Sequence, residues 1–379
     1  MAPVALCQQG GDLIGAIANY TELSTFSQVL QANPSLNTAF PTDGEGITLL
    51  IPDNAAFEKL FNQTNQSVQA FNADLFLPVL RYHIMAAKLT SKNFTTPRGL
   101  TVPTLLTGDE YNNRSAGADL VNDYGSQAAE GQVLAVSKDP INPAKLRLRQ
   151  SSAEGASLRG GLGLTASVSA VDGQWSLGYF QIIDVVLTLP GTCSSTVKTL
   201  KTSLSSLNSA LNRTGLWPTV NHSKNLTCLA PNNDAFSDAG NPEQTLNSTD
   251  LTNAILFHTL HEVTYTNYLT DGQVLESASG ESVQVQINGD DIYFNDAKVI
   301  GPNVLTNNGL IHVLDKVMSP LNASSTGSTT TTASGTSTAT SSSTASTAAT
   351  QSSSAAALTH GPVAAPGLVT LFLAMFMLL

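Results

Sequence analysis

The chain has 379 residues, of which 41% are hydrophobic and 12% are charged, and its formal net charge is −11. This length suits two domains, and the hydrophobic content is enough to bury a core in each. Charged residues make up about 25% of an ordinary soluble domain, and the excess of acids leaves no Lys/Arg stripe that would displace counterions from a nucleic acid. We therefore expect no nucleic acid partner.

Residues 1–9 form a short N-terminal remnant ahead of the first predicted domain. The start, MAPVALCQQGG, lacks both the basic segment and the apolar run of a secretory signal peptide. Because several features described below predict entry into the secretory pathway, we expect the true signal peptide to be missing from this sequence.

The first domain is predicted to span residues 10–190. Apolar residues at helical spacing between Leu13 and Leu30 predict two helices. The segment TLLIPDNAAF at Thr48–Phe57 has the pattern of a short apolar strand stopped by a proline. Its Asp/Asn pair is able to cap the helix that follows.

The first domain continues with a helix over Ala73–Ile84 that carries Tyr82 and His83. An apolar strand over Gly178–Pro190 closes it. Between the two lies an insertion within about 108–163, rich in Gly and Ser. An insertion of this size is either a functional loop or a disordered elaboration.

The second domain is predicted to span residues 191–321 and repeats the same features in the same order. Its strand-proline segment is TCLAPNNDAF at Thr227–Phe236, its aromatic-His pair is Phe257 and His258, and its closing strand is Gly309–Pro320. Similar segments in one order, twice, predict two copies of one domain.

The second copy has a compact meander where the first has its insertion. Ser282–Ile287 alternates between polar and apolar residues, Asn288-Gly289 is a strong hairpin turn, and Ile292–Phe294 returns. We expect an antiparallel hairpin here.

Asn-x-Ser/Thr sequons, the acceptors of N-linked glycans, are frequent in the chain. Ten of them, mostly at predicted loops or helix ends, favour a secreted glycoprotein over chance occurrence. They are Asn19, Asn62, Asn65, Asn93, Asn113, Asn212, Asn221, Asn225, Asn247 and Asn322.

The chain has three cysteines, Cys7, Cys193 and Cys228. In an oxidising compartment Cys193 and Cys228 could link the first helix of the second domain to the strand of its strand-proline segment, leaving Cys7 unpaired. The alternative is three free thiols, because a sequence does not give the Cα separation that a disulfide requires.

The C-terminal part divides into a stalk, 322–357, and a terminal segment, 358–379. The stalk is almost wholly Ser, Thr, Ala and Gly, which predicts a disordered, O-glycosylated spacer. Small residues, a spacer and the apolar run Gly367–Leu379 fit a signal for a glycosylphosphatidylinositol (GPI) anchor, attached at Ser353 or Ser354. A tail-anchored helix is the alternative.

Three features of each copy together resemble the fasciclin (FAS1) family: the strand-proline segment, which we call the box, the aromatic-His pair and the closing strand. Its domains open with a strand-Pro-Asn-x-Ala-Phe box and close with an Asn-Gly-x-Ile-His-x-Ile-Asp-x-Val strand. The second copy keeps nearly all of the closing pattern over Asn308–Val317, including His312 and Asp315, whereas the first has Gln181 in place of His. The resemblance covers about residues 10–320.

This resemblance implies an α+β fold. We expect two tandem FAS1 domains, each a β-sandwich or wedge with several packed helices, followed by the disordered Ser/Thr-rich stalk.

The resemblance also implies a set of family-motif residues. Animal members of the family present an Asn-x-Asp-Ile type loop and a Tyr-His pair to cell-surface receptors, and the Asp-Ile position here is Asn303-Val304. We expect the motif side chains to be structural, with a role in interaction as the alternative. They are Tyr82, His83, Phe257, His258, His312 and Asp315.

None of three patterns typical of metal binding or catalysis is complete in this sequence. His258, His261 and Glu262 lie within one helical turn, but not in the HExxH order of a zincin and with no third ligand evident. No Gly-x-Ser-x-Gly run follows a strand. Asp184 and Asp315 lie in closing strands without a paired acid nearby in sequence. We predict no catalytic residue, no metal site, no cofactor and no enzymatic activity.

The sequence thus predicts a GPI-anchored glycoprotein at the outer face of the plasma membrane or in the cell wall, of the kind expected in a walled eukaryote such as a fungus. The expected function is adhesion, through contacts with wall or matrix glycans and proteins or with like domains on other molecules. The alternative is a surface receptor that binds a small ligand or lipid in an apolar pocket.

Overall fold

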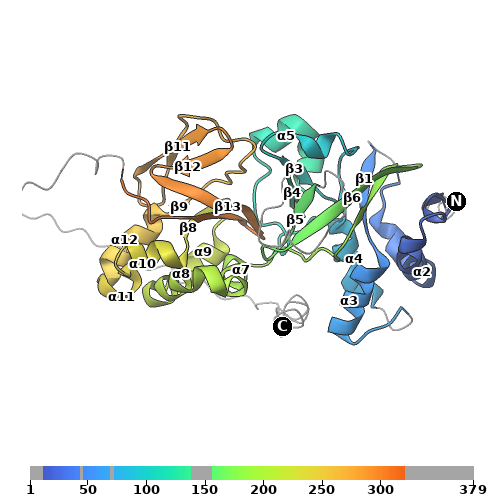
Figure 1. The fold of residues 1–379 in the computed structure, drawn as a ribbon, viewed down its shortest axis with the longest axis horizontal. Helices are drawn as coiled ribbons and strands as arrows, with labels where there is room; N and C mark the ends of the chain where they lie inside the picture. The colour runs from blue at the N-terminus through green and yellow to red at the C-terminus, as the bar shows by residue number, and fades with distance from the viewer. Residues whose placement is uncertain (1–11, 43–45, 69–71, 138–155, 321–379) are drawn as a thin grey trace, which may run out of the picture. The chain divides into compact units, whose positions relative to one another are not determined.

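The computed structural model describes residues 12–42, 46–68, 72–137 and 156–320, which belong to one compact unit (Figure 1). The predicted N-terminal remnant, stalk and anchor signal lie outside the described residues, as do Cys7, Asn322, Ser353 and Ser354.

The first repeat begins with a helix over 12–17. The elements that follow are η1 (Thr21–Leu23), α2 (Ser24–Ala32), η2 (Pro34–Ala39), β1 (Ile47–Pro52), α3 (Asn54–Thr64), α4 (Ala73–Tyr82), β2 (Ile84–Met85), η3 (Asn93–Thr95), β3 (Leu100–Pro103), α5 (Ala118–Tyr124), α6 (Ser126–Ala129), β4 (Val133–Ser137), β5 (Ser157–Arg159), β6 (Thr165–Trp175) and β7 (Gly178–Ile183).

The second repeat follows after a short connection. Its elements are α7 (Cys193–Thr199), α8 (Lys201–Thr214), α9 (Trp217–His222), β8 (Leu226–Pro231), α10 (Asn233–Asp238), α11 (Pro242–Thr245), α12 (Ser248–Phe257), β9 (Thr259–Leu260), β10 (Val274–Glu276), β11 (Ser282–Asn288), β12 (Asp291–Phe294), β13 (Ala297–Thr306) and β14 (Gly309–Leu314).

Each repeat is built on a seven-stranded sheet, and the two sheets have the same strand order. The order is β2-β1-β7-β6-β5-β4-β3 in the first repeat and β9-β8-β14-β13-β12-β11-β10 in the second. The box strand and the closing strand pair in parallel, as β1 with β7 and β8 with β14, and all other neighbours are antiparallel. This one-to-one match confirms the prediction of two copies of one α+β domain.

Both sheets curl until their outermost strands meet. An isolated antiparallel bridge joins Met85 to Thr104 in the first repeat, and another joins Leu260 to Ser277 in the second. Each sheet is therefore close to a barrel, which leaves its edges short and covered.

The box residues explain why each helix begins where it does. Asp53 and Asn232 are N-caps, and their side chains accept a hydrogen bond from the backbone N–H of Ala56 and Ala235, both at 2.7 Å. The predicted capping is confirmed.

The second box asparagine of each repeat ties the box to the preceding helices. Asn54 accepts from the N–H of Thr25 at 2.9 Å and donates to the carbonyl of Thr21. Asn233 accepts from the N–H of Ser206 at 3.0 Å in the second repeat. This use of both ends of an amide accounts for the Asn in the box.

A glycine opens each closing strand because the two central strands approach closely there. Gly178 has φ +149° and Gly309 has φ +152°. A Cβ at Gly309 would lie 1.9 Å from the carbonyl oxygen of Leu226, and one at Gly178 would lie 2.0 Å from that of Ile47. No side chain fits at either position.

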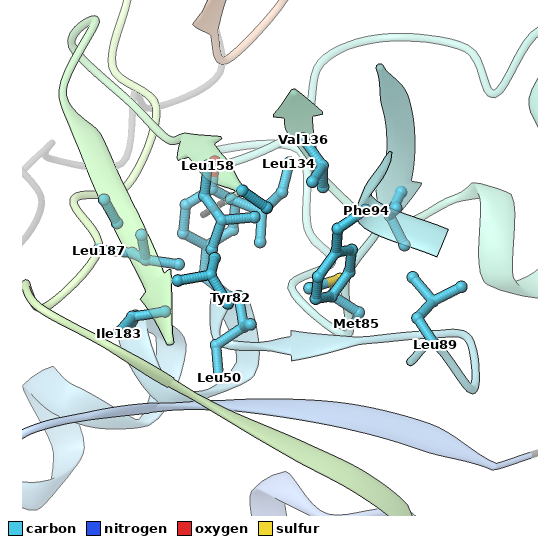
Figure 2. Close-up of a cluster of buried hydrophobic side chains, with 14 of the residues drawn as sticks. Leu50, Tyr82, Met85, Leu89, Phe94, Leu134, Val136, Leu158, Ile183 and Leu187 are labelled. Carbon is cyan, nitrogen blue, oxygen red and sulfur yellow. The ribbon is translucent and has the colours of Figure 1, made fainter. Parts of the chain in front are cut away.

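The apolar cores lie both between the helices and the sheets and inside the curled sheets. Figure 2 shows a cluster in the first repeat, with the Tyr82 ring inside it and Leu50, Leu158 and Leu187 around it. The second repeat has one cluster between its helices and sheet and another inside its curled sheet, where Phe294 is fully buried.

The hairpin predicted around Asn288 is confirmed, with its turn one residue further on. Asn288 pairs with Asp291, so the two-residue loop is Gly289–Asp290, and Gly289 has φ +64°. Of the predicted insertion, the described part contains α5, α6, β4 and β5. Its ordered helices and strands take part in the contact between the two repeats described below.

Candidate interaction surfaces

The Tyr-His pair of the first repeat is buried. Tyr82 is 0% exposed and donates its hydroxyl hydrogen to the carbonyl of Val133 at 3.0 Å. His83 is 1% exposed, its Nδ1 lies 2.7 Å from the carbonyl oxygen of Val79, and its Nε2 accepts from the N–H of Leu187 at 3.0 Å. His83 therefore ties the end of α4 to the segment after β7, and neither side chain is available to a partner.

In the matching pair of the second repeat, the phenylalanine lacks the tyrosine hydroxyl, and the histidine makes equivalent contacts. Phe257 is buried inside the curled sheet. The Nδ1 of His258 lies 2.8 Å from the carbonyl oxygen of Ala254, and its Nε2 accepts from the N–H of Met318 at 2.9 Å. Both histidines therefore join the helix end to the chain that leaves the closing strand.

His312, in β14, holds a bulge in the neighbouring strand β13. It is 0% exposed. Its Nε2 lies 2.8 Å from the carbonyl oxygen of Thr264, and its Nδ1 accepts from the N–H of Asn303, which has φ +51° at the register shift. The ring thus satisfies the backbone groups that the bulge leaves unpaired.

Gln181 binds the backbone of the equivalent bulge in the first repeat. Its Oε1 accepts from the N–H groups of Val171 and Asp172 at the bulge of β6, and its Nε2 donates to the Asp172 carboxylate at 2.7 Å. Asp172, like Asn303, has a positive φ, +44°. A glutamine can replace His312 because the position needs a donor and an acceptor.

The Asp-Ile position and the closing-strand acid are also tied to the backbone. Asn303 is 8% exposed, accepts from the N–H of Thr266 and donates to its hydroxyl at 2.7 Å. Asp315 accepts from the N–H of Lys298 at 2.8 Å. The family-motif side chains thus form no open site on the described surface.

Burial lowers the pKa of His83, His258 and His312 to about 4 in each case. The bonds of these rings to carbonyl oxygens oppose the shift but do not overcome it. All three are therefore neutral imidazoles near pH 7, each donating from one ring nitrogen and accepting at the other.

The two repeats meet through an apolar cluster that draws on both. The predicted insertion supplies Leu120 and Val133, and the second repeat supplies Tyr265, Leu305 and Leu310. A parallel bridge between Gly161 and Leu305 also joins the two, and β13 contacts β4 and β5. We call this region the joint.

Hydrogen bonds surround the joint. They run from the Asn113 N–H to the Asn307 carbonyl at 2.6 Å, from the Thr101 hydroxyl to the Asn267 side chain at 2.6 Å, from the Arg98 guanidinium to the Leu269 carbonyl at 2.8 Å, from the Tyr268 hydroxyl to the Asp123 carboxylate at 2.7 Å, and from the Ser115 N–H to the Asn225 side chain at 2.6 Å.

Arg159, at the end of β5, is a buried cation, and none of the described residues forms an ion pair with it. It is 5% exposed, and its Nε–H has no acceptor within the described ranges. Burial lowers its pKa from 12.5 to about 10, and the proximity of its charge helps to lower the pKa of His312. A buried unpaired charge costs folding free energy.

Arg159→Met is therefore expected to raise the free energy of unfolding by about 1–3 kcal/mol, because it removes the charge and keeps most of the side-chain volume. Urea denaturation at pH 7 measures this. The partly exposed Arg81→Met is the matched control and should change stability by no more than about 0.5 kcal/mol. A destabilised Arg159→Met protein would show that the guanidinium has a favourable partner.

An open polar groove lies on the outer face of the β11–β12 hairpin. Its volume is about 620 Å³. Gln284, Gln286, Asn288, Tyr293, Asp271 and Asp296 are among the residues that line it. The sequence indicated that polar and apolar residues alternate along β11. It did not indicate which residues of β12 and of the preceding loop would lie beside the outward-facing side chains of β11.

A second open cavity, of about 630 Å³, is lined by His261, Glu262, Glu276 and the turn that follows β10. His258 does not take part, because its ring is turned into the core. Within the ranges described, no group of three or more His, Cys, Asp or Glu side chains is placed to hold a metal ion.

The sequon asparagines divide by exposure. Asn221 and Asn225 are partly buried, and their amides donate to the hydroxyls of Ser194 and Ser115. Asn113 is also partly buried, at the joint. The exposed members of the set are Asn19, Asn62, Asn65, Asn93, Asn212 and Asn247.

Cys193 and Cys228 are free thiols in the structure, whereas the sequence left open either a disulfide between them or free thiols. Both are buried in the helix-side cluster of the second repeat. A hydrogen bond with Cys228, together with burial, raises the pKa of the Cys193 thiol well above its ordinary value. The sulfurs are thus in contact without a bond between them, and the disulfide remains a prediction.

None of the helices in the described ranges combines the length and the apolar character needed to cross a bilayer.

Comparisons with known proteins agree with this architecture. The profile of the Fasciclin domain matches residues 21–189 and 202–320. A fasciclin-like arabinogalactan protein from the fungus Arthroderma benhamiae is 27% identical over 309 residues, which cover 81% of this chain and 66% of that protein. Human periostin is 28% identical over 150 residues, which cover 38% of this chain and 18% of periostin.

Among solved structures, a FAS1 domain pair from the insect cell adhesion molecule Fasciclin I covers 79% of this chain and 95% of its own. The sequence identity is 17% and the TM-score is 0.35. The chain spans just under two thirds of the fungal relative and a much smaller part of periostin. The family profile matches well over half of the chain, in two regions that coincide with the two repeats, and the chain therefore belongs to the fasciclin domain family.

Proposed function

We propose that the protein is a non-catalytic adhesion module that binds cell-wall or extracellular-matrix components at the cell surface. The observation that supports this most is that the family-motif side chains are occupied in holding the fold. Three buried neutral histidines and Asp315 are all engaged in backbone hydrogen bonds, so the repeats form a scaffold whose contacts with partners must use the outer surface.

The same proposal includes how the two repeats are held at the cell surface. The Ser/Thr-rich segment 322–357 would act as a glycosylated stalk, and 358–379 as the signal for a GPI anchor at Ser353 or Ser354. Multivalent display on a surface strengthens contacts that are individually weak.

The runner-up, a receptor with an apolar pocket for a small ligand or lipid, has less support. Both cavities described above are open, and polar side chains contribute much of their lining: amides and carboxylates in the first, and an imidazole, carboxylates and hydroxyls in the second. Ligand pockets for apolar molecules are enclosed and lined by hydrophobic side chains.

Cells that express the full chain are expected to adhere to immobilised wall or matrix preparations, whereas cells without it should not. Phosphatidylinositol-specific phospholipase C should release the protein and abolish the adhesion, because the anchor is lipid. Adhesion that is equal with and without the chain would refute the adhesive function. Release by detergent alone, with the C-terminal peptide retained, would refute the anchor and leave adhesion intact.

A further inference from the structure

The strands β11 and β12 and their equivalents in the first repeat, β4 and β5, are used differently. In the first repeat, β4 is buried over nearly its whole length, and it takes part in the joint. In the second repeat, β11 alternates between buried and exposed residues, and its outer face stays open. The second repeat therefore carries a free surface where the first has a contact.

Strand alternation determines what this face presents. Val283 and Val285 point into the core, so Gln284 and Gln286 point outward. Gln286 is directly opposite Tyr293 in the hairpin register. The Tyr293 ring is half-buried, so one surface of the ring lies at the groove beside the glutamine amides.

The polar groups of the groove are available for a ligand. The side chains of Gln284, Gln286 and Asn288 make no hydrogen bond with any described residue, and each amide carries donors and an acceptor. Asp271 and Asp296 each use one carboxylate oxygen to accept a backbone N–H, from Ile287 and Ser319. The second oxygen of each carboxylate is left to accept another hydrogen bond.

The charges around the groove exclude several kinds of ligand. Two carboxylates and no Lys or Arg line it, and the chain carries a net charge of −11, so sulfated or uronic glycans and phosphate groups would be repelled. The nearby Lys298 is held by Asp291 at 2.6 Å. The polar lining does not suit an apolar ligand.

The exposed sequons on the described part of the second repeat lie away from this face. No sequon occurs between Asn247 and Asn322. The exposed sequons of the second repeat are Asn212 in α8 and Asn247 at the start of α12, whereas β11 and β12 lie on the far side of β8 and β9 from those helices (Figure 1).

We propose that this groove binds a short segment of a neutral polysaccharide. Sugar hydroxyls both donate and accept hydrogen bonds, which matches amides and carboxylates that each have one oxygen left to accept. The C–H face of a sugar ring can pack on the Tyr293 ring. The inference rests on the proposed adhesive function and names the chemical class of its partner.

The test titrates the purified full chain with neutral hexasaccharides of glucose, mannose and N-acetylglucosamine, and with a sulfated hexasaccharide. One or more neutral probes should bind in the millimolar range or tighter, and the sulfated one at least tenfold more weakly. Tyr293→Ser and the double variant Gln284→Ala/Gln286→Ala should each lose at least tenfold in affinity while keeping the melting temperature.

The matched controls are Tyr179→Ser in the first repeat and the exposed Gln31→Ala, and both should bind as the parent chain does. Unchanged neutral-sugar binding by Tyr293→Ser overturns the proposal, as does preference for the sulfated probe. It is also overturned if the groove variants abolish self-association while no sugar binds, since the face would then contact a second copy. If cells carrying the groove variants still adhere, the groove is refuted and adhesion stands; if parent cells fail to adhere, the proposed function itself is refuted.

Discussion

Lowering the pH from 7 to 5 is expected to lower the free energy of unfolding of the two repeats, taken together, by roughly 6 kcal/mol. His83, His258 and His312 have a folded-state pKa of about 4, against an ordinary value of 6.5. Each ring accepts a hydrogen bond from a backbone N–H, and protonation would turn that acceptor into a second donor facing the same N–H.

The direction follows from proton uptake. Between pH 6.5 and about 4 the unfolded chain binds protons at these histidines and the folded chain does not, so the free energy of unfolding falls as pH falls. Each histidine should contribute a loss of about 2 kcal/mol between pH 7 and pH 5, and the three together roughly 6 kcal/mol. That is comparable to the whole stability of many domains, which is about 5–15 kcal/mol.

Urea denaturation at a series of pH values measures this dependence. His258→Gln should lower the free energy of unfolding at pH 7. Between pH 6 and pH 5, the slope of the free energy of unfolding against pH should become flatter by about 1.4 kcal/mol per pH unit. His222→Gln is the matched control, because that ring is exposed. An equally steep slope in His258→Gln would mean that carboxylates, and not this histidine, cause the acid sensitivity.

Gly309→Ala is expected to cost at least about 3 kcal/mol, among the largest effects of any single substitution in the chain. The new Cβ would lie 1.9 Å from the Leu226 carbonyl oxygen, and the residue has φ +152°, where an L side chain is strained. Neither central strand can withdraw without breaking the parallel pairing of β8 with β14.

Gly280→Ala is the matched control, because Gly280 also has a positive φ, +83°, but a Cβ there would meet no atom within 4 Å. It should cost only about 1 kcal/mol. Trp217 lies in the second repeat, so its fluorescence in a Trp175→Phe background reports the unfolding of that repeat. Equal stability of the two alanine variants would show that the strands can separate locally.

Much of the fold could be predicted from the sequence because its signals are local. The box combines a strand, a proline and a capping residue within ten positions, and the caps at Asp53 and Asn232 form as predicted. The β11–β12 hairpin is equally local, since alternation and a glycine turn determine it.

The joint, by contrast, could not be predicted from periodicity. The Gly- and Ser-rich insertion is predicted to be a functional loop or a disordered elaboration, yet its residues Leu120 and Val133 pack against residues of the other repeat, up to 190 positions further along the chain. Arg159 was missed for the same reason. Its burial depends on the second repeat covering β5, and an arginine in a short strand gives no local sign of that.

The groove falls between these cases. Alternation along β11 predicts that Gln284 and Gln286 point outward, but only the register of the hairpin places Tyr293 opposite Gln286. The Asn303 position shows a further limit. Animal members of the family have a receptor-binding loop at this position, whereas the backbone here is a buried bulge that His312 and Thr266 hold.

The position of β14 bears on how the molecule would carry a mechanical load. The chain leaves the second repeat just beyond this strand, which is hydrogen-bonded on both sides and matched with β8 over six residue pairs from Gly309 to Leu314. Tension applied through a cell-surface tether would pull along the strand axis. The rungs between β14 and β8 would then share the force in shear, whereas a tether at an edge strand would peel them apart one at a time.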